Sequence, residues 1–176
     1  KENQFEVLMS RNITTGMTTA ISKRIAELGK NKPQNVFHDA WYIYIASISG
    51  MRGIVIEESL INYRQHVNQQ FGAIKHERWK RIYNSIKSSN QIVYINIKIL
   101  EPLFNFASEN VMDKNDLNLK YLENKLDHFN ARKVILESAS FARFFKISYE
   151  ILRGGYFNFG SWKNILTDLV FKNTNR

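Results

Sequence analysis

The sequence predicts an α/β fold, with part of a β-sheet over residues 1–73 and a mainly α-helical region over 74–176. Three observations lead to this prediction. The stretch GIVIEES at 53–59 has the β-branched alternation of a strand. Beyond residue 73, apolar residues recur at steps of three and four, the spacing of one helix face. An apolar content of 44% with only two prolines fits continuous packing around a core.

The front region is expected to begin with two helices. Residues 4–11 predict a short first helix. The threonine-rich stretch around Gly16 predicts an extended segment whose backbone approaches a neighbour closely. Apolar residues at helical spacing from Ser22 predict a second helix, with Gly29 in the C-cap position.

A third, buried helix is expected in NVFHDAWYIYIASISG, residues 35–50, where apolar residues recur at steps of four until Gly50. The strand at 53–59 follows, and residues 60–72 are expected to be extended and then looped. Because two strands do not form a stable sheet, we expect this region to be the second half of a sheet whose first half is missing.

The rear region is expected to hold four helices. A single apolar stripe from Ile82 to Phe104 predicts a long helix, with a kink or an early stop at Pro102. A polar connection follows. Further apolar stripes predict three more helices, within residues 119–129, 134–152 and 165–170, with the last two separated by GGYFNFG.

Composition limits the classes of function. The net charge of +9 favours an anionic partner, which could be nucleic acid, a phospholipid surface or a phosphate-bearing substrate. The absence of cysteine excludes disulfides and thiolate metal sites. No stretch approaches the roughly 20 apolar residues of a membrane span, and the start does not resemble a signal peptide. Because the chain opens on Lys1 and not on methionine, we expect a fragment whose partner half lies upstream.

Asp39 has two interpretations at the start of the helix in 35–50. A carboxylate there accepts backbone N–H groups and interacts well with the helix dipole, an effect of about 1 kcal/mol. The same position would suit a general base, with His38 orienting it or contacting a phosphate. The pair alone does not decide between these roles.

A second polar group follows the expected strand, in the stretch NYRQHVNQQFG at 62–72. If the strand continues, Arg64 and His66 face the same side. Together they would offer a guanidinium for phosphate oxygens and an imidazole for a metal ion. A polar strand end with solvated side chains is the alternative.

The segments NITTGMTTAISKRI, HDAWYIYIASISG and GIVIEESLINYRQHVNQQFGA resemble, in order and spacing, the C-terminal half of bacterial family 2 glycosyltransferases. The similarity is greatest to the rhamnosyltransferase-like enzymes of surface polysaccharide synthesis, and it covers roughly residues 12–73. It implies that residues 1–73 are the acceptor side of a GT-A catalytic domain and that 74–176 are a helical C-terminal extension.

The resemblance also assigns roles to residues. Asp39 matches the catalytic base that deprotonates the acceptor hydroxyl, and His66 matches a histidine that ligates the divalent metal. The tryptophan that often follows the His-Asp pair directly stands one position later here, after Ala40. The residues implied in substrate binding are Thr15, Gly16, His38, Trp41, Arg64 and Gln65.

The implied function is inverting transfer of a sugar, such as rhamnose, from a nucleotide-sugar donor to a glycan or lipid-linked acceptor. A Mg²⁺ or Mn²⁺ ion would be shared with the missing half, because no Asp-x-Asp motif occurs in this chain. The chain alone is therefore expected to be inactive. The expected location is the cytoplasm, including the inner face of the membrane.

Non-catalytic alternatives remain open. One is a scaffold or acceptor-binding piece, which the missing donor half makes physically reasonable. The cluster KHERWKR at 75–81 would suit a basic helical module, but no recognised nucleic-acid motif supports it, so we expect no nucleic-acid partner. The stretch GGYFNFGSWKNILTDLVFKN at 154–173 mixes aromatic and basic residues, which suits peripheral contact with a membrane. An ordinary contact between helices would also explain it.

Overall fold

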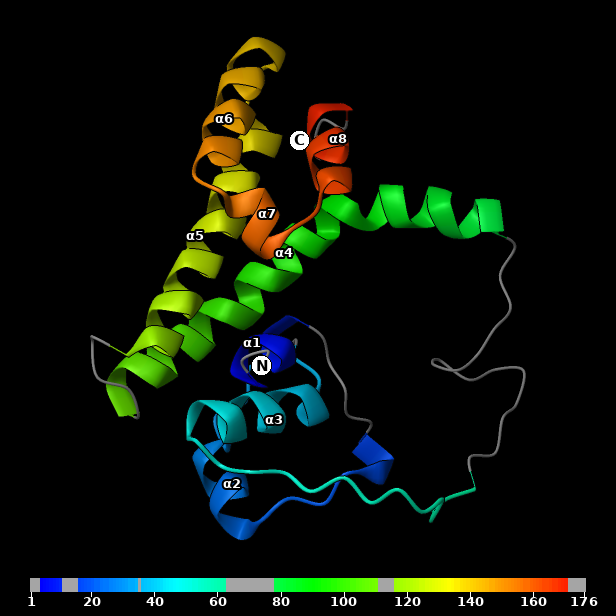
Figure 1. Ribbon diagram of the computed structural model, residues 1–176, viewed down its shortest axis with the longest axis vertical. Helices are drawn as coiled ribbons and strands as arrows, with labels where there is room; N and C mark the ends of the chain where they lie inside the picture. The colour runs from blue at the N-terminus through cyan, green and yellow to red at the C-terminus, as the bar shows by residue number, and fades with distance from the viewer. Residues whose placement is uncertain (1–3, 11–15, 35, 63–77, 111–115, 171–176) are drawn as a thin grey trace.

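The computed structural model describes residues 4–10, 16–34, 36–62, 78–110 and 116–170 (Figure 1). Of these residues 74% are helical and none forms a strand, so the predicted partial GT-A sheet is wrong. Residues 53–59 belong to no helix or strand, and Ile54 and Val55 are 93% and 84% exposed. β-Branched residues favour a strand, but a strand also needs a neighbour for its backbone N–H and C=O groups. None of the described residues provides that neighbour.

The first two predicted helices are confirmed as α1 (Gln4–Ser10) and α2 (Lys23–Leu28). The Ser22 hydroxyl accepts the Ile25 N–H at 3.4 Å at the start of α2, and the Gly29 N–H bonds to the Ile25 carbonyl at its end. The segment expected to be extended instead contains a 3-10 turn, η1 (Gly16–Thr18). The third helix is α3 (His38–Ile48), and Gly50 follows it with a φ of +66° that disfavours other residues.

The rear region contains α4 (Arg78–Asn110), α5 (Leu117–Glu137) and α6 (Ser140–Leu152). Two shorter helices, α7 (Gly155–Phe159) and α8 (Trp162–Val170), complete it. Pro102 does not end α4, contrary to one of the two outcomes expected there. Val134, expected in the same helix as residues 141–152, lies in α5. Among the described helices, none is both long enough and apolar enough for a membrane span.

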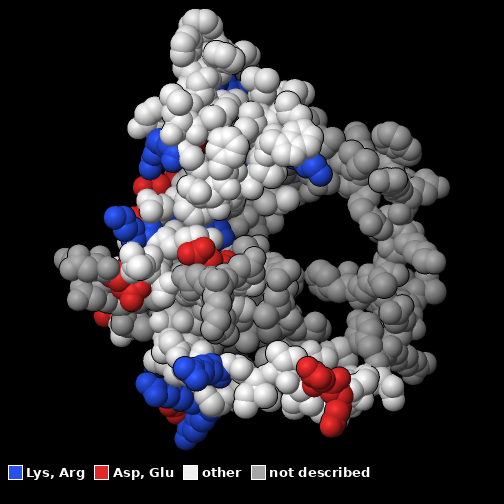
Figure 2. Space-filling view, viewed as in Figure 1, with Lys and Arg blue, Asp and Glu red and all other residues white. Residues whose placement is uncertain are grey.

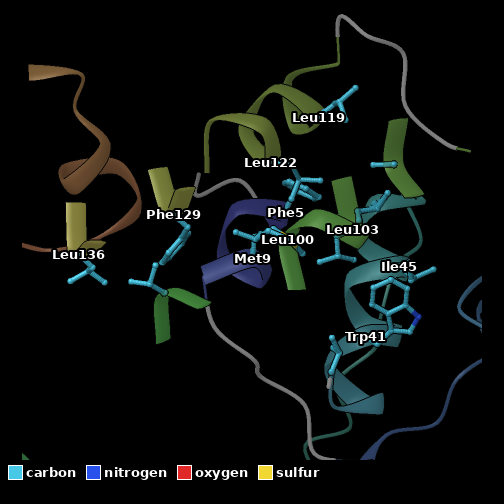
Figure 3. Packing of buried hydrophobic residues seen from close by; sticks show 14 residues of the cluster. Phe5, Met9, Trp41, Ile45, Leu100, Leu103, Leu119, Leu122, Phe129 and Leu136 are labelled. Atoms are coloured by element: carbon cyan, nitrogen blue, oxygen red, sulfur yellow. The ribbon is translucent and has the colours of Figure 1, made fainter. Parts of the chain in front are cut away.

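The main core lies where α4 and α5 pack against each other and against the N-terminal helices (Figure 1). Figure 3 shows Phe5 and Met9 of α1 beside Leu100 of α4 and Leu122 of α5. Trp41 and Ile45 bring α3 into the same cluster. The core therefore joins residues from both sides of position 73.

The helix α6 turns its most apolar stripe toward solvent. Phe141 and Leu152 are 80% and 86% exposed, and Phe145 and Tyr149 are also exposed. Its buried residues are Arg143, Ile147 and Glu150. Two of these three are charged, so the helices α5 to α8 are joined by polar side chains as well as by a small apolar cluster of Ile135, Ile147 and Tyr156.

Candidate functional site

The sequence-predicted site falls partly within the described residues. Gly16, His38, Asp39 and Trp41 are described, and the structure brings the first three together. The other candidates lie outside the described residues: Thr15, Arg64, Gln65 and His66.

Asp39 lies in the first turn of α3 and links that helix to η1. Its Oδ2 accepts the Gly16 N–H at 3.1 Å, and its Oδ1 accepts the Ala40 N–H at 2.8 Å. The N-cap residue is Phe37, whose side chain has no acceptor for these groups. Asp39 therefore satisfies a backbone donor of the first turn, as the local interpretation requires, and also holds a segment 23 residues away.

His38 is exposed, and its ring lies against Gly16. A Cβ atom at Gly16 would lie 2.5 Å from the His38 Nε2, so the close approach depends on the missing side chain. The sequence predicted that the backbone at Gly16 approaches a neighbour closely, and the structure shows that this neighbour is the His38 side chain. Together, His38 and Asp39 flank a single glycine backbone.

Trp41 is a core residue. Its side chain is 3% exposed, and its Nε1–H donates to the Gly29 carbonyl at 2.8 Å. This bond ties α3 to the end of α2. Little of the indole surface is left for an acceptor, so the described position of Trp41 favours a structural role.

The described residues do not form a metal centre by themselves. Both carboxylate oxygens of Asp39 already accept a backbone N–H. Across the described ranges, no group of three or more His, Asp or Glu side chains is placed to share an ion. His66, the metal ligand expected from the sequence, lies outside the described residues.

A second polar group, which the sequence analysis missed, is buried among α5, α6, α7 and α8. Arg132 donates to both carboxylate oxygens of Asp168, from Nε at 2.7 Å and from Nη2 at 2.9 Å. The Tyr156 O–H donates to the Asp168 Oδ2 at 2.8 Å. These three side chains are almost completely buried, so their hydrogen bonds offset the loss of hydration.

The neighbouring buried pair is His128 and Glu150, whose Nδ1 and Oε1 lie 2.7 Å apart. Burial, together with the nearby Arg132, lowers the pKa of His128 to about 4. Burial also raises the pKa of Glu150, whereas Arg153 opposes that shift. The imidazole is therefore neutral at pH 7. Its Nδ1–H donates to Glu150 where that carboxyl is ionised.

A cavity of about 150 Å³ lies beside this pair. The Glu150 Oε2 and the His128 Nε2 are buried and have no hydrogen-bond partner among the described residues. A Cβ atom at Gly155 would lie 1.8 Å from the Glu150 Oε1, so only glycine fits at the start of α7. The residues around the cavity are Asn124, Glu150, Arg153, Gly155, Asn158 and Phe159.

One pattern in the sequence could have indicated the buried group. Leu122, Lys125, Phe129, Arg132 and Leu136 are spaced 3, 4, 3 and 4, and all five are buried. The stripe is continuous only if the two basic residues are counted as part of it. Their partners cannot be read from this spacing, because they come from other helices. No family model, no curated protein and no solved structure matches this chain.

Proposed function

We propose that this chain supplies the acceptor side of an inverting glycosyltransferase, in which Asp39 deprotonates the acceptor hydroxyl. The supporting observation is the convergence of Gly16, His38 and Asp39, three residues that the sequence resemblance assigned to one site. The described fold does not contribute to this proposal, because it lacks the expected sheet.

The geometry of Asp39 is compatible with a general base. Each carboxylate oxygen can accept two hydrogen bonds. One bond to each oxygen is used by Gly16 and Ala40, so an acceptor hydroxyl could still approach. His38 is exposed next to this carboxylate and could bind an acceptor or a phosphate oxygen. The nucleotide-sugar donor would be bound mainly by a half of the protein that carries the Asp-x-Asp motif.

The divalent metal belongs to the same proposal. Mg²⁺ or Mn²⁺ would neutralise the leaving diphosphate, with His66 as a ligand from this chain. Asp39 would take the proton from the acceptor oxygen as the glycosidic bond forms on the face opposite the leaving group. This division assigns the base to the described residues and the metal ligands to other parts of the protein.

The replacement Asp39→Asn tests the base. Measured in the enzyme formed by this chain and its nucleotide-binding half, it should lower the transfer rate by about 10²- to 10⁴-fold. The matched control is Asp116→Asn, which changes the N-cap carboxylate of α5 in the same way. Asparagine is about as good an N-cap as aspartate, so the control should keep its activity. If both variants fold and Asp39→Asn transfers sugar at a near-normal rate, Asp39 serves only to stabilise the helix.

A second candidate function, contact with a phospholipid surface, is favoured by the exposed side chains of α6 to α8. Figure 2 shows this part of the surface as mostly uncharged, with a few basic side chains. Phe157 and Trp162 are exposed, as is the aromatic stripe of α6 that contains Phe141 and Phe145. Aromatic and aliphatic side chains next to Lys and Arg suit the interface of an anionic membrane.

Sedimentation with anionic vesicles at low salt tests this second function. The double replacement Phe141→Ser and Phe145→Ser should reduce pelleting, since both side chains are exposed and would enter the interface. Leu117→Ser is the matched control, because Leu117 is 81% exposed but begins α5 at the end away from α6 (Figure 1). Absence of pelleting, or equal loss in both variants, would rule out this surface.

A further inference from the structure

The cavity beside Glu150 is large enough for more than one water molecule. Its volume is about 150 Å³, whereas about 10–15 Å³ measured in the same way holds one water. It is lined by three consecutive helices, with Asn124 from α5, Glu150 from α6 and Asn158 from α7. The walls are thus held in place by the packing of the helical region.

Glu150 gives the cavity an acceptor that the protein does not satisfy. Its Oε1 is held by His128 at 2.7 Å, which leaves Oε2 as the free oxygen. The nearest cation is Arg153, whose Nη1 is 3.8 Å from Oε2, beyond hydrogen-bond distance. Because the residue is only 2% exposed, the missing donor can come only from a molecule inside the cavity, either an ordered water or a ligand. A ligand hydroxyl would fill this position.

The rest of the lining offers both donors and acceptors around one apolar wall. Asn124 and Asn158 each carry a carboxamide with an acceptor oxygen and an N–H₂ donor. Arg153 adds donors at the rim, and Phe159 adds an aromatic ring. Planar amide, carboxylate and guanidinium groups around an aromatic ring suit a ring-shaped ligand with neighbouring hydroxyls.

Charge argues against an ionic ligand. The Arg153 guanidinium would repel a metal cation, and the Glu150 carboxylate, where ionised, would repel an anion. The two charges lie close enough to offset each other. A metal ion is further disfavoured because, in the described part of the chain, no third His, Asp or Glu joins Glu150 and His128 as a ligand set.

We propose that this cavity binds a neutral ring that carries neighbouring hydroxyls, such as one sugar ring of a glycan. The Glu150 Oε2 accepts a hydroxyl, the two asparagines and Arg153 bind neighbouring hydroxyls, and Phe159 packs against the face of the ring. The site is separate from Asp39 and does not depend on transfer chemistry. It would hold a saccharide in a catalytic and in a non-catalytic protein alike.

NMR titration of the intact chain with glucose and with rhamnose tests the site. The side-chain amide signals of Asn124 and Asn158 should shift and saturate, with a dissociation constant on the order of millimolar for so small a ligand. Asn124→Leu should weaken binding by up to about tenfold, since one direct hydrogen bond to the ligand is lost. Asn130→Leu, an exposed position on the same helix, should leave binding unchanged.

Three results would overturn the proposal. The first is no saturable shift with either sugar up to about 100 mM, well above the expected constant. The second is an equal response to glycerol, which would mark the shifts as non-specific. The third is tighter binding of inorganic phosphate than of either sugar, which would make the cavity an anion site.

Discussion

Asp168→Ala is the sharpest test of the buried polar group. Asp168 accepts two hydrogen bonds from Arg132 and one from Tyr156, and none of the three side chains is appreciably exposed. Removing one partner of a buried ion pair leaves the other charge without compensation, which costs about 3–5 kcal/mol. Total stability is typically about 5–15 kcal/mol, so the variant should lose a large part of it.

Urea unfolding followed by circular dichroism measures this loss. With a slope of about 2 kcal/mol per molar urea, typical of small proteins, the midpoint should fall by about 2 M. The exposed ion pair between Arg153 and Asp127 spans 3.9 Å, so Asp127→Ala should cost less than about 1 kcal/mol. The double replacement Arg132→Met and Asp168→Leu should recover part of the stability, because it leaves no buried charge unpaired and only the Tyr156 O–H loses its acceptor. If Asp168→Ala costs no more than Asp127→Ala, or if the double replacement is as unstable as the single one, the reasoning fails.

Three further predictions concern single residues. The pKa of His128 is lowered to about 4 from 6.5, so the unfolded chain binds more protons between these values. The contribution of neutral His128 to the unfolding free energy is therefore complete above pH 6.5 and is lost as the pH falls toward 4. An NMR titration of the His128 ring with a midpoint near 6.5 would contradict this prediction. Trp41→Phe removes the hydrogen bond to the Gly29 carbonyl and should lower the unfolding free energy by about 1–3 kcal/mol, measured by urea unfolding. An unchanged free energy would show that this bond does not stabilise the fold. Gly50→Ala should lower the unfolding free energy by about 1 kcal/mol, because alanine disfavours the φ of +66° at this position. Gly53→Ala is the control, since a Cβ atom there meets open space. Equal urea midpoints for the two variants would refute the strain at Gly50.

The sequence predicted helices well where their signals are local. Ser22 and Gly29 bracket α2 as their chemistry indicates, and Gly50 follows the end of α3. The strand at 53–59 was wrong because a strand is not a local structure: its backbone must pair with another segment, which the described residues do not provide. The aromatic stripe of α6 shows the same limit, since helical spacing predicts a helix without fixing which face is buried.

The roles of the candidate site residues stay predictions, and the sequence indicated only part of the geometry that the structure describes. The place of Asp39 at a helix start was expected from the sequence. The resemblance assigned Gly16 and Asp39 to one site, but their hydrogen bond was not predicted. The buried pairs of Arg132 with Asp168 and of His128 with Glu150 were missed. Their partners are separated by 36 and 22 residues, and no periodic pattern relates them.

These buried polar contacts make α5 the helix that orders its neighbours. Lys125 donates its Nζ to the Met9 carbonyl of α1, and burial lowers its pKa to about 8. His128 bonds to α6, and Arg132 bonds to α8. Apolar packing is not directional, so leucines alone could accept these helices in several registers. We infer that the three polar residues specify which helix lies at each position along α5, at a cost in stability that an apolar α5 would avoid.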